Sequence, residues 1–298
     1  MCGIVGLFLK DAGLEARLGA LLTEMLVTMT DRGPDSAGIA IYGGAREGFG
    51  KITVQSANPE RDLRDLEGAL REVLGAPVTV LVKSTHAVIE VPQDRIGAAR
   101  AALAELRPEV KVMSVGDAIE IFKEVGLPRD VAARFDVARM GGTHGIGHTR
   151  MATESAVTTM GAHPFSTGPD QCLVHNGSLS NHNGLRRELI RKGMTFETQN
   201  DTEVAAAYVS QKLREGADLG TALESGLEDL DGFYTFVVGT RNGFGVVRDP
   251  IACKPAVMAE TERYVAFGSE YRALVNLPGI EAARVWEPEP ATVYFWER

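Results

Sequence analysis

The stretch MCGIVGLFL, residues 1–9, decides how the rest of this chain is interpreted. Gly3 to Leu9 is an apolar run of strand length, and leucines and methionines then recur at helical spacing between Leu14 and Met29. This pattern predicts a strand that leads into an amphipathic helix. Glycine and proline within residues 31–35 end the helix in a loop, and residues 38–42 predict the next strand. Polar residues of that loop are therefore expected near the first strand.

Composition and charge narrow the class of protein. The chain has 298 residues, 44% hydrophobic and 24% charged, which is ordinary for a globular protein and excludes a disordered chain, a collagen or a coiled coil. The net charge of −9, without clustered lysine and arginine, argues against nucleic acid as a partner. There is no window of about 18 apolar residues, and no basic segment precedes the apolar start. Neither a membrane span nor an export signal is expected.

The cysteines bear on the redox compartment. Cys2, Cys172 and Cys253 are odd in number and widely spaced, so we expect neither a disulfide framework nor a cysteine-based metal or iron–sulfur site. This usage is typical of a reducing environment, and the expected location is the cytoplasm.

Residues 51 to about 115 predict a separate set of strands and helices. Their order of strand, helix, two strands, helix and strand is that of a ferredoxin-like unit. The predicted elements are a strand at 52–56, a helix at 60–74, strands at 78–84 and 87–91, a helix at 94–106 and a strand at 110–114. We expect this insert to protrude from the main body as a docking or regulatory element. A stabilising addition without a partner is the alternative.

The rest of the chain predicts a mainly antiparallel α+β body that this insert interrupts. The pattern predicts helices at 119–125, 131–135, 185–191 and 203–213, and a hairpin of strands 233–239 and 243–248 that turns at Arg241-Asn242-Gly243.

Cys2 is the first candidate for chemistry. Removal of Met1 would place a thiol and a free α-amine on one residue. The amine titrates near 7.7–8.0 and a free thiol near 8.5, so the amine can accept the thiol proton at neutral pH. A buried cysteine at the head of a strand is the alternative that position 2 alone leaves open.

Ordered motifs favour the nucleophile. Together they resemble the class II glutamine amidotransferases, which are N-terminal-nucleophile hydrolases. Two later stretches resemble the glutaminase motifs of phosphoribosyl amidotransferases and asparagine synthetases, so the resemblance runs from residue 1 to about 275. The five main motifs are Met1-Cys2-Gly3-Ile4-Val5-Gly6, Arg32-Gly33-Pro34-Asp35-Ser36-Ala37-Gly38, Gly147-His148-Thr149-Arg150-Met151-Ala152-Thr153, His175-Asn176-Gly177 and Asn200-Asp201-Thr202-Glu203. The later stretches are Arg248-Asp249-Pro250 with Lys254-Pro255, and Gly268-Ser269-Glu270 with Ala273-Leu274.

The resemblance implies a fold and a reaction. The fold is a four-layer αββα sandwich with Cys2 at the end of a central strand. The reaction is hydrolysis of glutamine to glutamate and ammonia through a thioester on Cys2. The chain departs from the family pattern at Asp31 and Glu154, where relatives have histidine, and in the long insert between Tyr42 and His144.

The resemblance also assigns substrate-binding residues. Arg150 would bind the α-carboxylate of glutamine with a planar fork that lysine cannot match, and a surface salt bridge is the alternative. Asp201 would accept the α-ammonium group, and helix capping with Asn200 is compatible with that role. Thr153 and Arg32 would complete substrate binding, Arg32 by ordering the groups around the nucleophile.

Asn176 and Gly177 would form the oxyanion hole. In the family reading, the Asn176 amide and the Gly177 backbone N–H face the oxyanion that forms on the attacked carboxamide. Asn-Gly between apolar stretches is also the strongest short signal for a tight hairpin turn, which is the alternative here. For Asp35, in the loop facing the nucleophile strand, an ion pair within the loop is an equal alternative to a role in the site.

The histidines do not predict a metal site. Five of the six lie between His144 and His182, but glycines make a helix between His144 and His148 improbable. In a strand these two would be roughly 13 Å apart, too far to share one zinc. The Gly-rich run at 141–147 lacks the Gly-Lys-Ser/Thr of a phosphate loop. No metal and no cofactor are expected on this chain.

A partner is expected on the same resemblance. About 24 residues follow the last motif, too few for a second core, so the acceptor half is expected on another chain. The chain is most similar to the amidotransferase-like subunit of glutamate-synthase-related complexes, N-methylglutamate synthase in particular, whose partner subunits carry FMN and iron–sulfur clusters. A phosphoribosyl-type amidotransferase and a catalytically silent regulatory subunit of the same fold are the alternatives.

Overall fold

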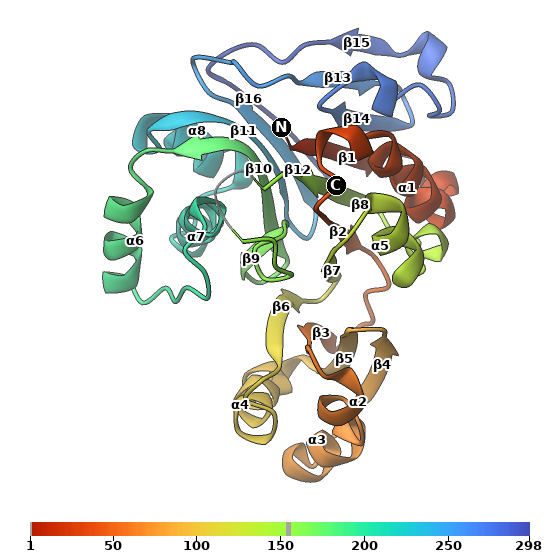
Figure 1. Ribbon diagram of the computed structural model, residues 1–298, viewed down its shortest axis with the longest axis vertical. Helices are drawn as coiled ribbons and strands as arrows, with labels where there is room; N and C mark the ends of the chain where they lie inside the picture. The colour runs from red at the N-terminus through yellow and green to blue at the C-terminus, as the bar shows by residue number, and fades with distance from the viewer. Residues whose placement is uncertain (1, 153–155) are drawn as a thin grey trace.

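Two stacked antiparallel sheets between layers of helices form the main body, as Figure 1 shows. The structure, a computed structural model, describes residues 2–152 and 156–298. Within these residues the larger sheet has seven strands, in spatial order β15 (Arg284–Trp286), β13 (Val257–Glu260), β14 (Tyr264–Gly268), β1 (Gly3–Leu9), β8 (His144–Arg150), β2 (Ser36–Tyr42) and β7 (Ile119–Val125). The smaller sheet has five described strands, in the order β16 (Thr292–Glu297), β12 (Gly243–Arg248), β11 (Gly232–Gly239), β10 (Gln171–Leu179) and β9 (Phe165–Gly168).

Helices cover the outer face of each sheet. The larger sheet packs against α1 (Leu18–Thr28) and α5 (Pro128–Arg134). The smaller sheet packs against α7 (Asp201–Arg214) and α8 (Leu219–Asp229), and α6 (His182–Arg191) lies on α7. A third apolar core fills the space between the two sheets. The predicted α+β fold class and four-layer sandwich are confirmed.

Strand β1 lies in the middle of the larger sheet, where it pairs with β8 on one side and β14 on the other. All seven of its residues are buried, which explains the continuous apolar run from Gly3 to Leu9. The following helix begins as a 3-10 turn, Ala12–Arg17, capped by Asp11, whose side chain accepts from the Gly13 amide. The predicted strand and helix are therefore both present, with Cys2 at the open end of the central strand.

Residues 119–125 are strand β7, so the predicted helix there is wrong. The strand pairs with β2 along its whole length and forms one edge of the sheet. Ile119 and Ile121 lie in the core between the sheets, whereas Phe122 lies in the core beneath the helices. A strand buried on both faces lacks a clean alternation, which is why the pattern was mistaken for a helix.

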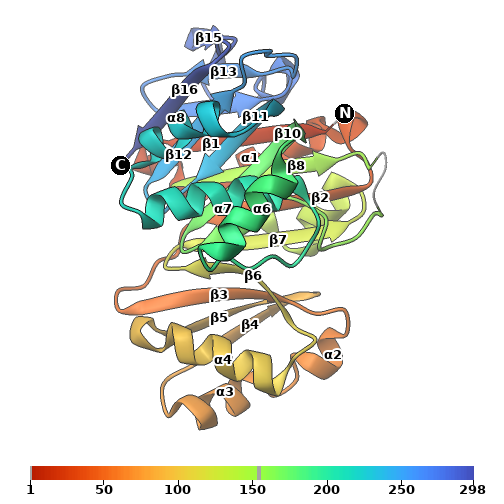
Figure 2. The same cartoon turned by 90° about the vertical axis from the view of Figure 1, so that its left-hand side faces the viewer.

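The insert is a separate four-stranded antiparallel sheet with helices on one face, below the sandwich in Figure 2. Its spatial order β4-β5-β3-β6 is that of a ferredoxin-like unit. The strands are β3 (Phe49–Gln55), β4 (Thr79–Lys83), β5 (His86–Pro92) and β6 (Lys111–Gly116), and the helices are α2 (Pro59–Asp62), α3 (Leu66–Leu74) and α4 (Ile96–Leu106). The single helix predicted at 60–74 is wrong because Asp65, with φ 54°, breaks it into α2 and α3.

The remaining predicted elements are present. Helices α5, α6 and α7 overlap the predictions at 131–135, 185–191 and 203–213, and β11 and β12 form the predicted hairpin. No helix in the described part of the chain is long and apolar enough to cross a membrane.

Candidate active site

The backbone of Cys2 is held by two side chains that are distant in sequence. Its carbonyl oxygen accepts one hydrogen bond from Arg32 Nε, at 3.0 Å, and another from Asn176 Nδ2, at 3.3 Å. The side chain of Cys2 is partly exposed. The loop after α1 and the middle of β10 therefore meet at the start of the nucleophile strand.

Glu270 orients Arg32. Its carboxylate accepts from Arg32 Nη1 at 2.7 Å, and that hydrogen bond lowers the pKa of Glu270. The neighbouring Ser269 bonds Ile4 twice, since its hydroxyl accepts from the Ile4 amide and its own amide donates to the Ile4 carbonyl, both at 2.9 Å. These two positioning residues were not predicted, although the Gly268-Ser269-Glu270 motif contained the signal.

Asn176 and Gly177 lie within strand β10, opposite Thr235 and Tyr234 of β11. The alternative of a tight hairpin turn is therefore wrong. Gly177 has φ +144°, and a Cβ added there would lie 1.9 Å from the carbonyl oxygen of Phe233. Glycine is thus required at this position both by conformation and by space.

Asp201 lies at the first turn of α7, beside the end of β10. Its Oδ2 accepts from the Leu179 amide at 2.9 Å, and its Oδ1 lies 3.7 Å from Nδ1 of His175. Burial raises the pKa of Asp201, but His175, the Leu179 amide and His182 together lower it to about 2. The carboxylate is therefore ionised at neutral pH, as an ammonium-binding group must be.

Capping of α7 falls to Asn200, whose side chain accepts from the Thr202 amide at 2.8 Å. Glu203 does not return a bond to the Asn200 amide as a capping box requires, because it accepts from the amides of Glu197 and Thr198. Capping of the helix therefore does not require the carboxylate of Asp201.

Arg150 ends strand β8 and is buried rather than on the surface. Its Nη1 donates to the Ala156 carbonyl at 3.3 Å. The preceding residue, Thr149, pairs with Gly3, which places Arg150 at the same end of the sheet as Cys2. Thr153 and Glu154 lie outside the described residues.

Asp35 orders the backbone around Arg150. Its amide donates to the Arg150 carbonyl at 3.1 Å, and its carboxylate accepts from the Ala152 amide at 2.8 Å. Gly33 lies so close that a Cβ there would be 2.4 Å from the Thr149 carbonyl carbon. The bond to Ala152 gives Asp35 a role beside the site. Asp31 is an exposed partner of Arg272 at 3.3 Å.

Three buried histidines lie next to these groups. The rings of His148 and His163 stack 4.1 Å apart, and both His163 and His175 contact the Thr202 hydroxyl. Burial lowers the pKa of His148 to about 3 and that of His163 well below its usual value. His144, also in β8, instead bonds the Thr240 carbonyl. Among residues 2–152 and 156–298, no group of His, Cys, Asp or Glu is arranged to hold a metal ion.

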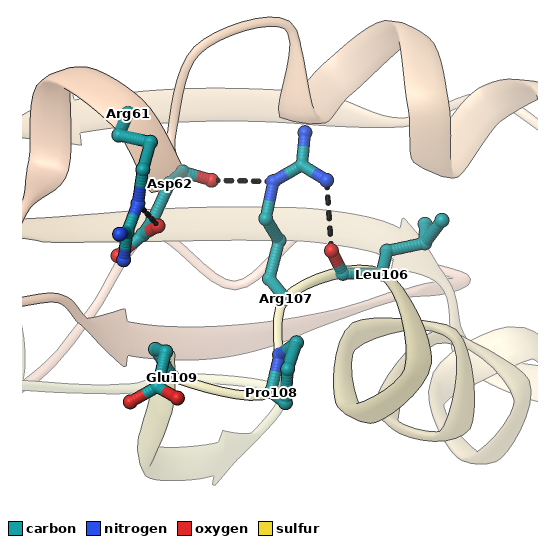
Figure 3. A pocket seen from close by; sticks show the side chains of 6 residues that line it. All are labelled: Arg61, Asp62, Leu106, Arg107, Pro108 and Glu109. Carbon is teal, nitrogen blue, oxygen red and sulfur yellow. Dashed lines mark hydrogen bonds and ion pairs between the residues drawn. The ribbon is translucent and has the colours of Figure 1, made fainter.

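A separate pocket of about 320 Å³ lies in the insert (Figure 3). Its polar groups already bond one another: Arg61 pairs with Asp62 at 2.7 Å, and Arg107 donates to the carbonyls of Asp62 and Leu106. None of the residues that the motifs single out lines this pocket. The candidate active site is therefore the end of the sandwich that carries Cys2 with Arg32 and Asn176 on its carbonyl, with Gly177, Arg150 and Asp201 on the neighbouring strand and helix ends.

Comparison with known proteins identifies similar sequences and a similar fold. A glutamine amidotransferase domain model matches residues 148–276. The chain is 73% identical to the glutamine amidotransferase-like protein GlxB of Rhizobium meliloti, over 100% of this chain and 98% of that protein. It is 40% identical to glutamine–fructose-6-phosphate aminotransferase of Vibrio vulnificus over 40% of this chain and 20% of that one.

A solved structure shows the same fold. The glutamine phosphoribosylpyrophosphate amidotransferase of B. subtilis superimposes with a TM-score of 0.63 at 19% identity, covering 99% of this chain and 47% of that one. This neighbour carries the N-terminal-nucleophile sandwich, and the chain spans about half its length. The 73% identity to GlxB over the whole chain establishes that the chain belongs to the glutamine amidotransferase family.

Proposed function

We propose that this chain hydrolyses glutamine to glutamate and ammonia through a thioester on Cys2, and passes the nitrogen to a separate synthase subunit. The observation that carries the proposal is the double hydrogen bond on the Cys2 carbonyl. Arg32 and Asn176 converge there and fix the thiol-bearing residue beside Gly177. A cysteine with only a structural role has no need of a partly buried arginine and a mid-strand asparagine on its backbone.

Recognition of glutamine uses two opposite charges. The Arg150 guanidinium can bind the α-carboxylate through two parallel N–H bonds, and the ionised Asp201 can accept the α-ammonium. Both residues lie at the end of the sandwich that holds Cys2. The carboxamide of a glutamine held in this way would extend toward the thiol.

The chemistry begins once Met1 is removed and the α-amine of Cys2 is free. The amine accepts the thiol proton, and the thiolate attacks the carboxamide carbon to form a C–S bond. The C–N bond then breaks, the amine returns its proton to the leaving nitrogen, and ammonia departs. Water, deprotonated by the same amine, cleaves the thioester and releases glutamate.

The negative oxygen of the intermediate needs donors that are already in place. A primary amide carries two N–H groups, so Asn176 can hold the Cys2 carbonyl with one and meet the oxyanion with the other. The Gly177 amide supplies the second donor in this proposal. The glycine is required there because a side chain would collide with Phe233.

The proposed partner is a synthase of the glutamate synthase or N-methylglutamate synthase type, with FMN and iron–sulfur clusters on that partner and none on this chain. Supporting a separate partner, GlxB matches over 98% of its length, whereas the aminotransferase of Vibrio vulnificus matches over only 20% of its own. The proposed location is the cytoplasm, which suits the three free cysteines.

The test combines intact-mass measurement with a glutaminase assay on the full chain. An active preparation should begin at Cys2, glutamine should yield equal amounts of glutamate and ammonia, and Cys2→Ala should abolish both products while the fold persists. Full retention of Met1 in an active preparation would rule out the amine as the built-in base. Undiminished activity of Cys2→Ala would rule out the thioester.

A further inference from the structure

The segment 156–164, which follows the Arg150 strand, lies against the guanidinium of that arginine. Arg150 Nη1 donates to the Ala156 carbonyl at 3.3 Å. A Cβ added at Gly161 would lie 3.3 Å from the same nitrogen. The position of this segment therefore limits where the guanidinium can point.

Lys123 of β7 holds the far part of the segment. Its ammonium donates to the carbonyls of Ala162, at 2.8 Å, and of Met160 and Pro164, both at 3.3 Å. Lys123 is only 3% exposed, and burial lowers its pKa to about 7. Three carbonyl bonds match the three donors of an ammonium group, so the buried charge is satisfied almost entirely by this one segment.

Glu124, the next residue of β7, holds the segment from the other side. Its Oε1 accepts from the hydroxyl of Thr159 and its Oε2 accepts from the hydroxyl of Thr85, the latter at 3.0 Å. Neighbouring residues of a strand point to opposite faces of the sheet. Because β7 is an edge strand, the segment can contact both faces of the sheet there. Lys123 bonds it on one face and Glu124 bonds it on the other.

Thr85 belongs to the insert, in the turn between β4 and β5. The insert is also joined firmly to β7 itself. The carboxylate of Asp170 accepts from three consecutive amides, those of Asp117, Ala118 and Ile119, at 2.8, 2.9 and 3.0 Å. The chain thus leaves β6 and enters β7 through a clamped junction, and Thr85 returns from the insert to the same strand.

We propose that Lys123 and Glu124 are positioning residues for glutamine recognition, which hold segment 156–164 against Arg150, and that the insert contributes to this recognition through Thr85. The proposal rests on the proposed glutaminase function. In this proposal the insert does not touch glutamine. It affects glutamine binding indirectly, because Thr85 helps to hold segment 156–164 against Arg150.

The test compares two reagents that alkylate Cys2 in the full chain. A chloroketone analogue of glutamine retains the α-carboxylate and α-ammonium, so its reaction depends on Arg150 and Asp201. Iodoacetamide lacks both groups. In each reaction the thiolate displaces a halide ion and forms a thioether, so mass spectrometry of Cys2 measures both rates in the same way.

The first variant is Thr85→Val, which removes one hydroxyl and keeps the shape. Loss of a hydrogen bond to a charged group should slow labelling by the chloroketone by roughly 3- to 10-fold, with the iodoacetamide rate unchanged. Thr85→Ser should restore the chloroketone rate. The matched control is Thr79→Val, the same change at an exposed threonine of β4, which should leave both rates unchanged.

Further variants test whether Lys123 and Glu124 act on glutamine recognition through segment 156–164. Lys123→Met should slow chloroketone labelling by about 10- to 100-fold, because three carbonyls lose their partner. In a Thr159→Val background, Thr85→Val should have little further effect, because both act through Glu124. Full additivity of the two changes would overturn the proposed route.

The outcomes separate the two proposals. If the wild-type chain is not labelled by the chloroketone and does not hydrolyse glutamine, the proposed function fails. If the wild type is labelled but Thr85→Val matches Thr79→Val, only the positioning role fails. Equal slowing of both reagents would show a general structural effect and would also overturn the positioning role.

Discussion

The site end of the sandwich and the helices of the insert differ clearly in what surrounds their glycines. At the candidate active site, a Cβ on Gly33 or Gly177 would lie 2.4 or 1.9 Å from backbone atoms. In the insert helices, a Cβ on Gly68 or Gly97 would have no neighbour within 4 Å. The site end of the sandwich is thus built by close approach of backbones, whereas the helices of the insert tolerate added atoms.

The two regions also differ in what their interiors contain. The hydrophobic cluster of the insert is wholly aliphatic, although the insert also buries polar side chains such as Ser56 and Asp62, which bond each other at 2.5 Å. The sandwich buries three phenylalanines between its sheets and, near the site, the polar side chains of His148, Arg150 and Asn176. Buried polar groups cost free energy unless they are bonded, and these three side chains lie at the end of the sandwich that carries Cys2.

The largest expected effect is that of Gly177→Ala. The added methyl group would overlap the Phe233 carbonyl in a backbone conformation that alanine rarely adopts. We expect the free energy of unfolding to fall by about 4 to 5 kcal/mol. Urea denaturation of the variant measures this, and a loss below about 1 kcal/mol would show that the strand can shift to make room.

Lowering the pH should reduce the free energy of unfolding, because the sandwich buries neutral histidines. Burial lowers the pKa of His144 and His148 to about 3, and that of His163 well below its usual value. The folded chain keeps them neutral, while the unfolded chain takes up protons below about pH 6.5, so stability falls as the pH drops through that value. Between pH 7.5 and 5.5 we expect each of these three histidines to contribute a loss of about 1.4 kcal/mol.

Urea denaturation at the two pH values measures that loss. A variant with His163→Gln should lose about 1.4 kcal/mol less than the wild type over the same range. A stability that does not change between the two pH values would contradict neutral burial of these rings.

Asn176→Ala should lower turnover by about 10²- to 10³-fold, because it removes an oxyanion donor. Steady-state assays of glutamine hydrolysis measure the effect. The control is Asn242→Ala, in the turn of the β11–β12 hairpin, which should keep wild-type turnover. An equal loss in both variants would mean that the activity reports stability and not the oxyanion hole.

Arg150→Lys should raise the half-saturating glutamine concentration about tenfold with little change in turnover, because the charge remains and the planar fork is lost. Arg139→Lys, at an arginine with 85% of its side chain exposed, is the matched control. An unchanged value for Arg150→Lys would assign this arginine a structural role only.

The smallest expected effect is on the insert. Gly68→Ala lies in α3, where the added methyl group has open space, and alanine favours a helix over glycine by about 0.5 to 1 kcal/mol. The variant should therefore be slightly more stable in urea denaturation and should keep its glutaminase activity. Destabilisation would show that the surface of this helix is covered.

Much of the site could be predicted from the sequence because it is encoded in short ordered motifs. The strand from Gly3 to Leu9 and the start of α7 at Asp201 agree with the pattern of apolar residues and caps. The family resemblance then assigned Arg150, Asn176 and Gly177. The strand order of the insert likewise follows from the order of its elements, because ferredoxin-like units connect in one way.

Only the tertiary structure decided which distant residues bond one another. Glu270 reaches Arg32 across 238 positions, and Ser269 reaches Ile4 across 265. It also decided that residues 119–125 form an edge strand and that Asn176-Gly177 lies within a strand instead of a turn. Local patterns report periodicity and turn chemistry over a few residues, whereas these outcomes depend on which surfaces pack together. The contacts from Thr85 through Glu124 to segment 156–164 likewise depend on tertiary packing.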